Sequence, residues 1–230
     1  AEKYPFEFPR ILRDMGGYRT ITVGKDHFGW NFTSNNGVSH GYENLTLYDG
    51  LGSWNKTKKT VTGEFDQYTK WFERELPGDD PLATLDEKLN LTESWNTWYG
   101  APYIYDEKFH PTRWVGDQAL EFLNSDNATK TPFLLKVSFH RPHSPYDPPA
   151  RLLDSIKAED LPLKHICGNE TSPPDDSGHG ESWCVRFRGK EKDAVGCGPS
   201  NPTAWCGLMP PDNETLSRRA YAASIQFVGS

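Results

Sequence analysis

The chain has 230 residues, a formal net charge of −7 and an isoelectric point near 5.5. This acidic balance argues against a nucleic-acid surface, which needs clustered lysines and arginines, and no stretch approaches the ~20 apolar residues of a membrane span. Only 35% of the residues are hydrophobic and the mean hydropathy is −0.74, low for a chain that must fill its own core. The length suits one domain, or a large piece of one.

The predicted helices and strands alternate along the chain. Gly16-Gly17 supplies the left-handed residues that end the first helix, and residues 132–137 form an apolar run typical of a buried strand, which a turn at 126–129 precedes. In chain order we expect elements at 5–15 (helix), 18–23 (strand), 64–75 (helix), 112–124 (helix), 132–137 (strand), 148–156 (helix) and 213–227 (helix). This alternation predicts an α/β fold.

Two of these helices carry an apolar face. Each face is typical of a helix that packs on a core, because its apolar residues recur at helical spacing. The predicted core positions are Phe65, Tyr68, Trp71 and Phe72 in the first helix and Val115, Ala119, Phe122 and Leu123 in the second.

A lysine and a histidine follow the first predicted strand. Lys25 and His27 lie within the segment 24–29, two residues apart, so they point to the same side if strand geometry continues that far. A lysine ammonium is a compact charge that suits a tetrahedral anion. These two residues are therefore candidates for binding an anionic group.

Two histidines and an arginine follow the second predicted strand. His140, Arg141 and His143 lie in the segment 138–149, where several prolines and Asp147 keep the backbone extended and irregular. Ligands of open α/β sheets bind beyond the carboxyl ends of the strands. We therefore expect both polar segments to leave parallel strands at one edge, with Lys25 and His143 within roughly 8 Å of each other.

In this order the two segments resemble the type I sulfatases, the formylglycine-dependent sulfuric ester hydrolases of the alkaline phosphatase superfamily. Residues 11–29 are similar to the family's helix, glycine turn, strand and Gly-Lys-x-His signature, and residues 132–149 to the strand and His-x-Pro loop of iduronate-type sulfatases. Residues 110–123 and 218–225 resemble two further helices of the family. The resemblance implies a mixed, mostly parallel sheet flanked by helices, as in alkaline phosphatase.

The resemblance also implies roles for single residues. It assigns Lys25 to the sulfate oxygens, His27 to the formylglycine hydroxyl and His143 to the sulfate and leaving-group side, with His140 and Arg141 as substrate-binding residues. Calcium and formylglycine would be the cofactors of the full-length family. The family's Cys-x-Pro-Ser-Arg nucleophile segment and its metal-binding aspartates have no match here, so we expect an incomplete catalytic domain that is inactive alone.

Each candidate also has a purely structural interpretation. Lys25 could be a solvated turn residue, and His27 could cap a helix or pack on neighbouring rings. His140 and Arg141 could bind backbone carbonyls of the proline-rich loop, and Asp147 could form a turn hydrogen bond. The pairing of Lys25 with His143 in an ordered family context favours the functional interpretation.

Three short motifs imitate the missing parts of the site. Residues 197–201 resemble the nucleophile segment, but Asn201 replaces the arginine and the segment follows Lys25 instead of preceding it. Residues 176–180 resemble Asp-His-Gly with an insertion, and Asp79-Asp80 has ordinary turn composition. We assign none of them to the site, because a short motif needs its structural context.

Glycosylation motifs indicate the compartment. The chain contains more Asn-x-Thr motifs than the one or two that chance would give, so we expect the secretory pathway, either extracellular or lysosomal. The motif at Asn31 lies close to the candidate site and is the least favoured. The candidate glycosylation sites are Asn44, Asn55, Asn90, Asn127, Asn169 and Asn213.

The cysteines are confined to one segment rich in Gly, Pro, Asp and Ser. We expect an insertion at about 163–212 held by two disulfides, with three possible pairings of Cys167, Cys184, Cys197 and Cys206. Zinc binding with His165 and His179 is the alternative, disfavoured because no Cys-x-x-Cys pair is present.

Two functions are compatible with the sequence. The first is hydrolysis of sulfate esters by the full-length protein, with a sulfated carbohydrate or a small sulfate ester as the substrate. The second is a catalytically inactive secreted glycoprotein that binds sulfated sugars through the remaining pocket. The fold alone does not separate the two.

Overall fold

The computed structural model describes residues 6–26, 39–48, 54–55, 60–61, 66–89, 99–162 and 211–230. The chain divides into two compact units. The first consists of Ala1–Pro81 and Tyr105–His140, and the second of Leu82–Ile104 and Arg141–Ser230. No helix within the described ranges is long and apolar enough to cross a membrane.

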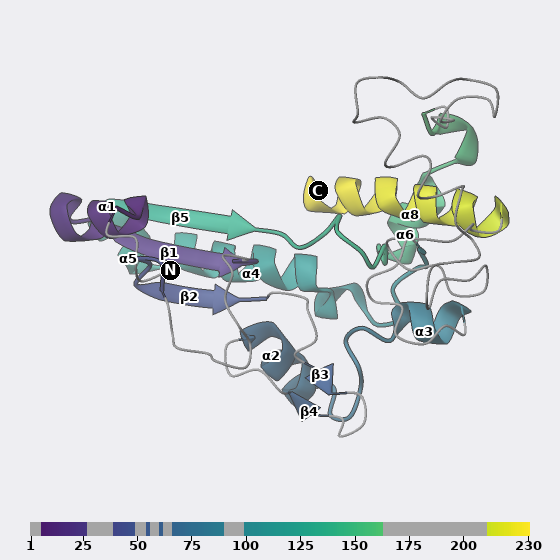
Figure 1. The fold of residues 1–230 in the computed structure, drawn as a ribbon, viewed down its shortest axis with the longest axis horizontal. Coiled ribbons are helices and arrows are strands. Elements are labelled where there is room, and N and C mark those ends of the chain that lie inside the picture. The colour runs from purple at the N-terminus through teal and green to yellow at the C-terminus, as the bar shows by residue number, and fades with distance from the viewer. Residues whose placement is uncertain are drawn as a thin grey trace, which may run out of the picture. The chain divides into compact units, whose positions relative to one another are not determined.

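The first unit is built on a parallel sheet of strand order β2-β1-β5 (Figure 1). The strands are β1 (Arg19–Gly24), β2 (Asn44–Leu47) and β5 (Phe133–Ser138). Gly24 is in register with Leu47 on one side and with Ser138 on the other. All three strands therefore end at the same edge, which confirms the prediction that the two polar segments leave parallel neighbours.

β5 is less buried than predicted. β1 is the middle strand of the described sheet, whereas β5 lies at its edge and most of its residues are half-buried. Val137 is 37% exposed. The prediction of a buried strand from the apolar run is wrong for these residues, because in the described sheet only one edge of β5 is paired.

Aromatic side chains fill the core of the first unit. The helices α2 (Gln67–Glu75) and α4 (Pro111–Leu123) supply Tyr68, Phe72 and Trp114, which pack with Ile21 and Val23 of β1. The Tyr68 ring meets the Trp114 ring edge-on, with a centroid distance of 5.5 Å. Burying a ring of this size stabilises the fold by about 1.5–3 kcal/mol relative to exposing it.

The predicted apolar faces are correct at most described positions. Tyr68 and Phe72 of α2 and Val115 and Ala119 of α4 are buried, but Leu123 is 44% exposed. Trp114 is buried although it lies outside the predicted stripe. The buried face of α4 is therefore concentrated in its first turns, and its last turn lies at the surface.

One short element of the first unit differs from its prediction. The predicted turn at 126–129 is a helix, α5 (Asp126–Lys130), in which Lys130 forms an ion pair with Asp126 at 2.8 Å. A two-stranded antiparallel sheet consists of β3 (Trp54–Asn55) and β4 (Thr60–Val61), and η2 (Glu107–Phe109) precedes α4. The Asp79-Asp80 pair follows a turn in which Gly78 has φ 85°, which agrees with its assignment to a turn.

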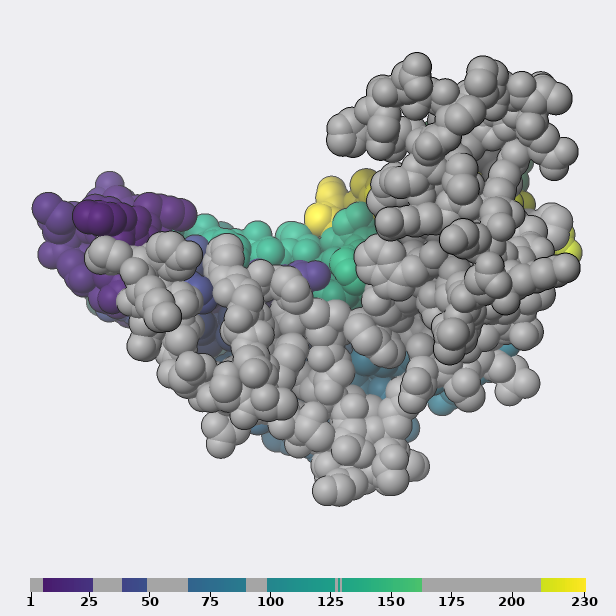
Figure 2. Space-filling view, viewed as in Figure 1, coloured from purple at the N-terminus to yellow at the C-terminus, as the bar shows by residue number. Residues whose placement is uncertain are grey.

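The first helix, α1 (Phe8–Gly16), ends as predicted. Gly17 adopts φ 69° and its N–H donates to the carbonyl of Leu12, which satisfies the end of the helix. Phe8 and Met15 of this helix are 60% and 85% exposed. The purple amino-terminal part of the chain is uncovered in the space-filling view (Figure 2).

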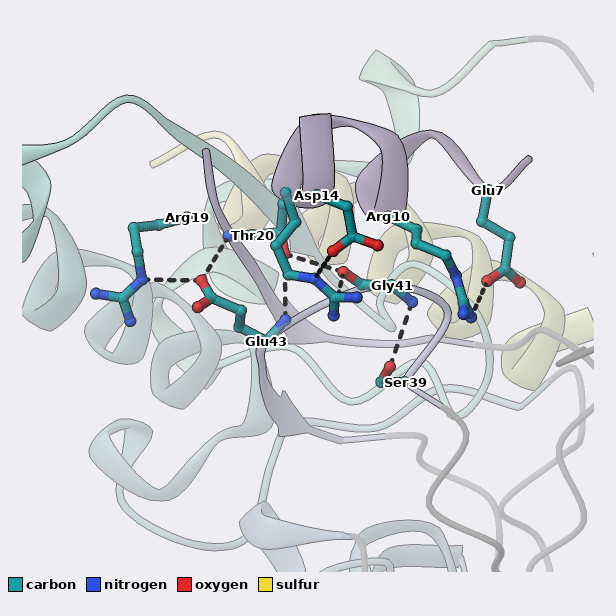
Figure 3. A network of polar contacts seen from close by, with 9 residues as sticks. Glu7, Arg10, Asp14, Arg19, Thr20, Ser39, Gly41 and Glu43 are labelled. Carbon is teal, nitrogen blue, oxygen red and sulfur yellow. Dashed lines mark hydrogen bonds and ion pairs between the residues drawn. The ribbon is translucent and has the colours of Figure 1, made fainter. Parts of the chain in front are cut away.

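Polar side chains fix the amino end of β1 (Figure 3). The Glu43 carboxylate accepts hydrogen bonds from Arg19 Nε at 2.8 Å and from the Thr20 N–H at 3.2 Å. The hydrogen bond from Arg19 lowers the pKa of Glu43 below its ordinary value. Thr20 Oγ1 donates to the carbonyl of Gly41 at 3.0 Å, and a Cβ at Gly41 would lie 2.4 Å from the backbone nitrogen of Arg10. These contacts hold the sheet from the end opposite to the candidate site.

The second unit is mainly helical in its described part. Its helices are α3 (Thr84–Leu89), α6 (Ala150–Ser155), η3 (Ala158–Asp160) and α8 (Pro211–Val228), so the predicted helices at 148–156 and 213–227 are confirmed. Leu152 and Leu153 of α6 pack against Ala220, Ala223 and Phe227 of α8. This contact is one of two buried hydrophobic clusters among the described residues of the unit; Leu85, Tyr99 and Ala101 form the other.

Candidate active site

Lys25 is fixed at the carboxyl edge of the sheet by its backbone. Its N–H donates to the carbonyl of Ser138, the last residue of β5, at 2.7 Å. Gly24 has φ 95°, and a Cβ there would lie 2.0 Å from that same carbonyl oxygen. Glycine is therefore required directly before Lys25, because any side chain would both strain the backbone and separate the two strands.

The residue after Lys25 forms an ion pair through a buried carboxylate. Asp26 is 4% exposed, and its Oδ1 accepts a hydrogen bond from Lys136 Nζ of β5 at 2.9 Å. Burial raises the pKa of the Tyr42 hydroxyl, and the charge of Asp26 adds to that effect. This pair was not predicted, although Lys136 is the single charged residue in the apolar run 132–137 and so gave a signal.

His140 lies in the first unit, two residues after β5. It is 4% exposed, and its ring centroid lies 5.5 Å from that of Tyr48, which follows β2. The buried position places an imidazole at the carboxyl edge of the sheet, near the end of β2. A substrate-binding role for His140 stays a prediction.

Arg141 forms a bidentate ion pair within the predicted His-x-Pro loop. Its Nε donates to Asp147 Oδ1 at 2.6 Å and its Nη2 to Asp147 Oδ2 at 2.9 Å. Both side chains are buried, with 1% and 0% of their surface exposed. Two parallel charge-assisted hydrogen bonds are the strongest contact that an arginine makes with a carboxylate. The substrate-binding role predicted for Arg141 stays untested.

His143 is exposed, next to the buried Ser144. Its Nδ1 lies 2.9 Å from the carbonyl oxygen of Ser144 and 3.4 Å from the Ser144 hydroxyl. A carbonyl oxygen only accepts, so the shorter contact requires the proton on Nδ1. In the neutral ring Nε2 is then the nitrogen without a proton.

Several candidate site residues lie outside the part of the chain that the structure describes. His27, the four cysteines and the candidate sites Asn90 and Asn169 lie outside the described residues. Asn44 is exposed at the start of β2, Asn55 lies in β3, Asn127 lies in α5 and Asn213 lies in α8. Lys25 belongs to the first unit and His143 to the second, so their convergence stays a prediction.

The described residues provide no ligand set for a metal ion. Across the described ranges, no group of three or more His, Cys, Asp or Glu is placed so that it could hold one. The part of the chain that the structure describes therefore supplies no such group for the calcium ion that the resemblance implies.

The small parallel sheet flanked by helices fits an alkaline-phosphatase-like α/β fold, with a lysine at the carboxyl edge of the sheet and histidines in the loop after the neighbouring strand. A comparison with family models matches residues 2–227 to the sulfatase family. The chain belongs to this family. It is also 35% identical over 175 residues to an arylsulfatase of Clostridium perfringens, which covers 74% of this chain and 34% of that protein. The chain thus spans about a third of the length of this relative.

Proposed function

We propose that the full-length protein containing this chain hydrolyses sulfate esters, and that the His143 loop is of the iduronate type. The family match over residues 2–227 carries the proposal, since sulfatases act on sulfate esters. The position of Lys25 supports it, because this lysine directly follows β1 where that strand and β5 end together. The arylsulfatase relative supports an aryl sulfate as one substrate class.

The chemistry assigns one task to each loop. Hydrolysis breaks the bond between sulfur and the leaving oxygen, so one water and one ester give an alcohol and hydrogen sulfate. The Lys25 ammonium stabilises the charge on the sulfate oxygens, and a fixed charge of this kind lowers the barrier when it fits the transition state best. His143 gives a proton from Nε2 to the leaving oxygen, which would otherwise depart as an anion. His27 is assigned to the nucleophile by the resemblance alone.

Cofactor chemistry belongs to the full-length protein. Sulfatases generally use formylglycine and a divalent metal, which supply the attacking group and its activation when bound. Binding and proton donation are the parts that Lys25 and His143 of this chain would perform. The isolated 230-residue chain is accordingly expected to show no turnover.

Turnover of an aryl sulfate by the full-length protein tests the proposal. Release of 4-nitrophenol from 4-nitrophenyl sulfate should be catalysed, with a higher kcat/KM than release from 4-nitrophenyl phosphate. If neither ester is hydrolysed while sulfated sugars bind, the inactive sugar-binding glycoprotein is the correct function. If neither hydrolysis nor binding occurs, both functions fail.

We also propose that the protein enters the secretory pathway. The Asn-x-Thr motifs and the confined cysteines of the sequence support this compartment. Peptide mapping of the secreted protein without reduction is expected to find Cys167, Cys184, Cys197 and Cys206 paired with one another, and sugar on motifs such as the exposed Asn44. Four free thiols, or zinc bound in equal amount, would overturn the proposal.

A further inference from the structure

The loop that carries His143 is closed at its base by the buried ion pair. Arg141 precedes His143 by two residues and Asp147 follows it by four, and their two hydrogen bonds join the ends of this short segment. Because both groups are buried, the pair is shielded from solvent, and breaking it would remove two charge-assisted hydrogen bonds from a buried charge. The backbone between the two residues is therefore held in one conformation.

The same loop is anchored to an extended segment of the second unit. The N–H of Ala101 donates to the carbonyl of Tyr146 at 3.0 Å, and the N–H of Tyr103 donates to the carbonyl of Pro148 at 2.9 Å. The Tyr146 ring meets the Tyr221 ring of α8 edge-on, with a centroid distance of 5.4 Å. Burial raises the pKa of Tyr146 to about 12, so the ring stays neutral in this packing.

His143 is exposed, whereas the residues that anchor its loop are buried. The buried residues are Arg141, Ser144 and Asp147. The carbonyl of Ser144 orients the imidazole through Nδ1. The loop thus has a buried ion pair at its base and an exposed imidazole, His143, whose tautomer is set by a backbone carbonyl.

We propose that Arg141 and Asp147 are positioning residues that hold the His143 ring with its Nδ1–H on a backbone carbonyl, so that Nε2 of the imidazolium donates its proton to the leaving oxygen and is left unprotonated. This inference rests on the proposed function. It gives Arg141 a different role from sulfate binding, because its Nε and Nη2 already donate to Asp147. An arginine in this state acts on the reaction through the loop and not by touching the substrate.

Two sulfate esters with different leaving groups distinguish a loss of His143 positioning from a general loss of structure. Phenol has a pKa near that of tyrosine, about 10, so the hydrolysis of phenyl sulfate depends on a proton donor for the leaving oxygen. 4-Nitrophenol is far more acidic, so 4-nitrophenyl sulfate depends on this donor much less. In the full-length protein, Asp147→Asn is expected to lower kcat for phenyl sulfate at least about tenfold more than for 4-nitrophenyl sulfate, with KM nearly unchanged. Equal losses for both esters, or no loss, would overturn the inference.

Two further variants show whether a loss of activity comes from a folding defect. Asp117→Asn removes the acceptor of an exposed ion pair with Arg113 in α4, 2.9 Å long, and is expected to leave both esters unaffected. If Asp147→Asn does not fold, Arg141→Lys keeps the charge but loses the bidentate geometry, and the same selective loss is expected.

A spectroscopic measurement tests the positioning without turnover. The ring ¹⁵N shifts of His143 should report the Nδ1–H tautomer in the wild-type protein and a mixture of tautomers in Asp147→Asn. Retention of the Nδ1–H form in the variant would overturn the inference even if the ester assays fail. Absence of turnover in the wild type, in contrast, would count against the proposed function alone.

Discussion

Replacing Gly24 with Ala is expected to lower the free energy of unfolding by about 3 kcal/mol or more. Gly24 has φ 95°, a conformation that costs an L-residue about 1–3 kcal/mol. The new Cβ would also lie 2.0 Å from the carbonyl oxygen of Ser138, which belongs to the backbone of β5 and cannot turn away as a side chain can. The strands would have to separate at the point where the Lys25 N–H bonds to this same carbonyl.

Gly116→Ala is the matched control. Gly116 lies inside α4, and nothing stands within 4 Å of the position that its Cβ would take. Alanine in a helix interior is better than glycine by roughly 0.5–1 kcal/mol, so this variant should be slightly more stable than the wild type. Denaturant unfolding followed by tryptophan fluorescence measures both variants, since Trp114 lies in the core of the same unit. A loss below about 1 kcal/mol for Gly24→Ala would contradict the close approach of β1 and β5.

The strands next to the candidate site were predictable from local signals. Gly16-Gly17 ends α1, and the strand-like run that follows becomes β1 within one residue of its predicted bounds. β2 was not predicted, because it is only four residues long and Asn44-Leu45-Thr46 was interpreted as a glycosylation motif. A short strand at the edge of a sheet gives little periodicity from which to predict it.

The ion pairs next to the candidate site were not predictable. Asp26 and Lys136 are 110 residues apart, and they meet because β1 and β5 pair in parallel with Gly24 opposite Ser138. A shift of the register by one residue would place Lys136 on the other face. Arg141 and Asp147 are close in sequence, but a turn hydrogen bond was an equally good interpretation of Asp147. The sequence contains the charges, whereas their partners depend on register and loop conformation.

Replacing Lys25 with Ala is expected to lower kcat/KM of the full-length protein for 4-nitrophenyl sulfate by at least ~100-fold. Removing one fixed group that stabilises charge in a transition state commonly costs 10²–10³ in rate. Lys25 is placed for this role because its backbone is bonded to the end of β5. The control is Lys130→Ala, which removes an exposed lysine paired with Asp126 one turn earlier in α5 and is expected to leave kcat/KM unchanged. An equal kcat/KM for the wild type and Lys25→Ala would show that this lysine has no role in the reaction.

Titration of the ¹⁵N-labelled full-length protein with inorganic sulfate tests whether Lys25 and His143 bind one sulfate group. We expect the Lys25 amide and the His143 ring signals to shift together with a single Kd, and Lys25→Ala to abolish the shift of His143. A His143 signal that stays unchanged while Lys25 saturates, or that follows a separate Kd, would contradict the account.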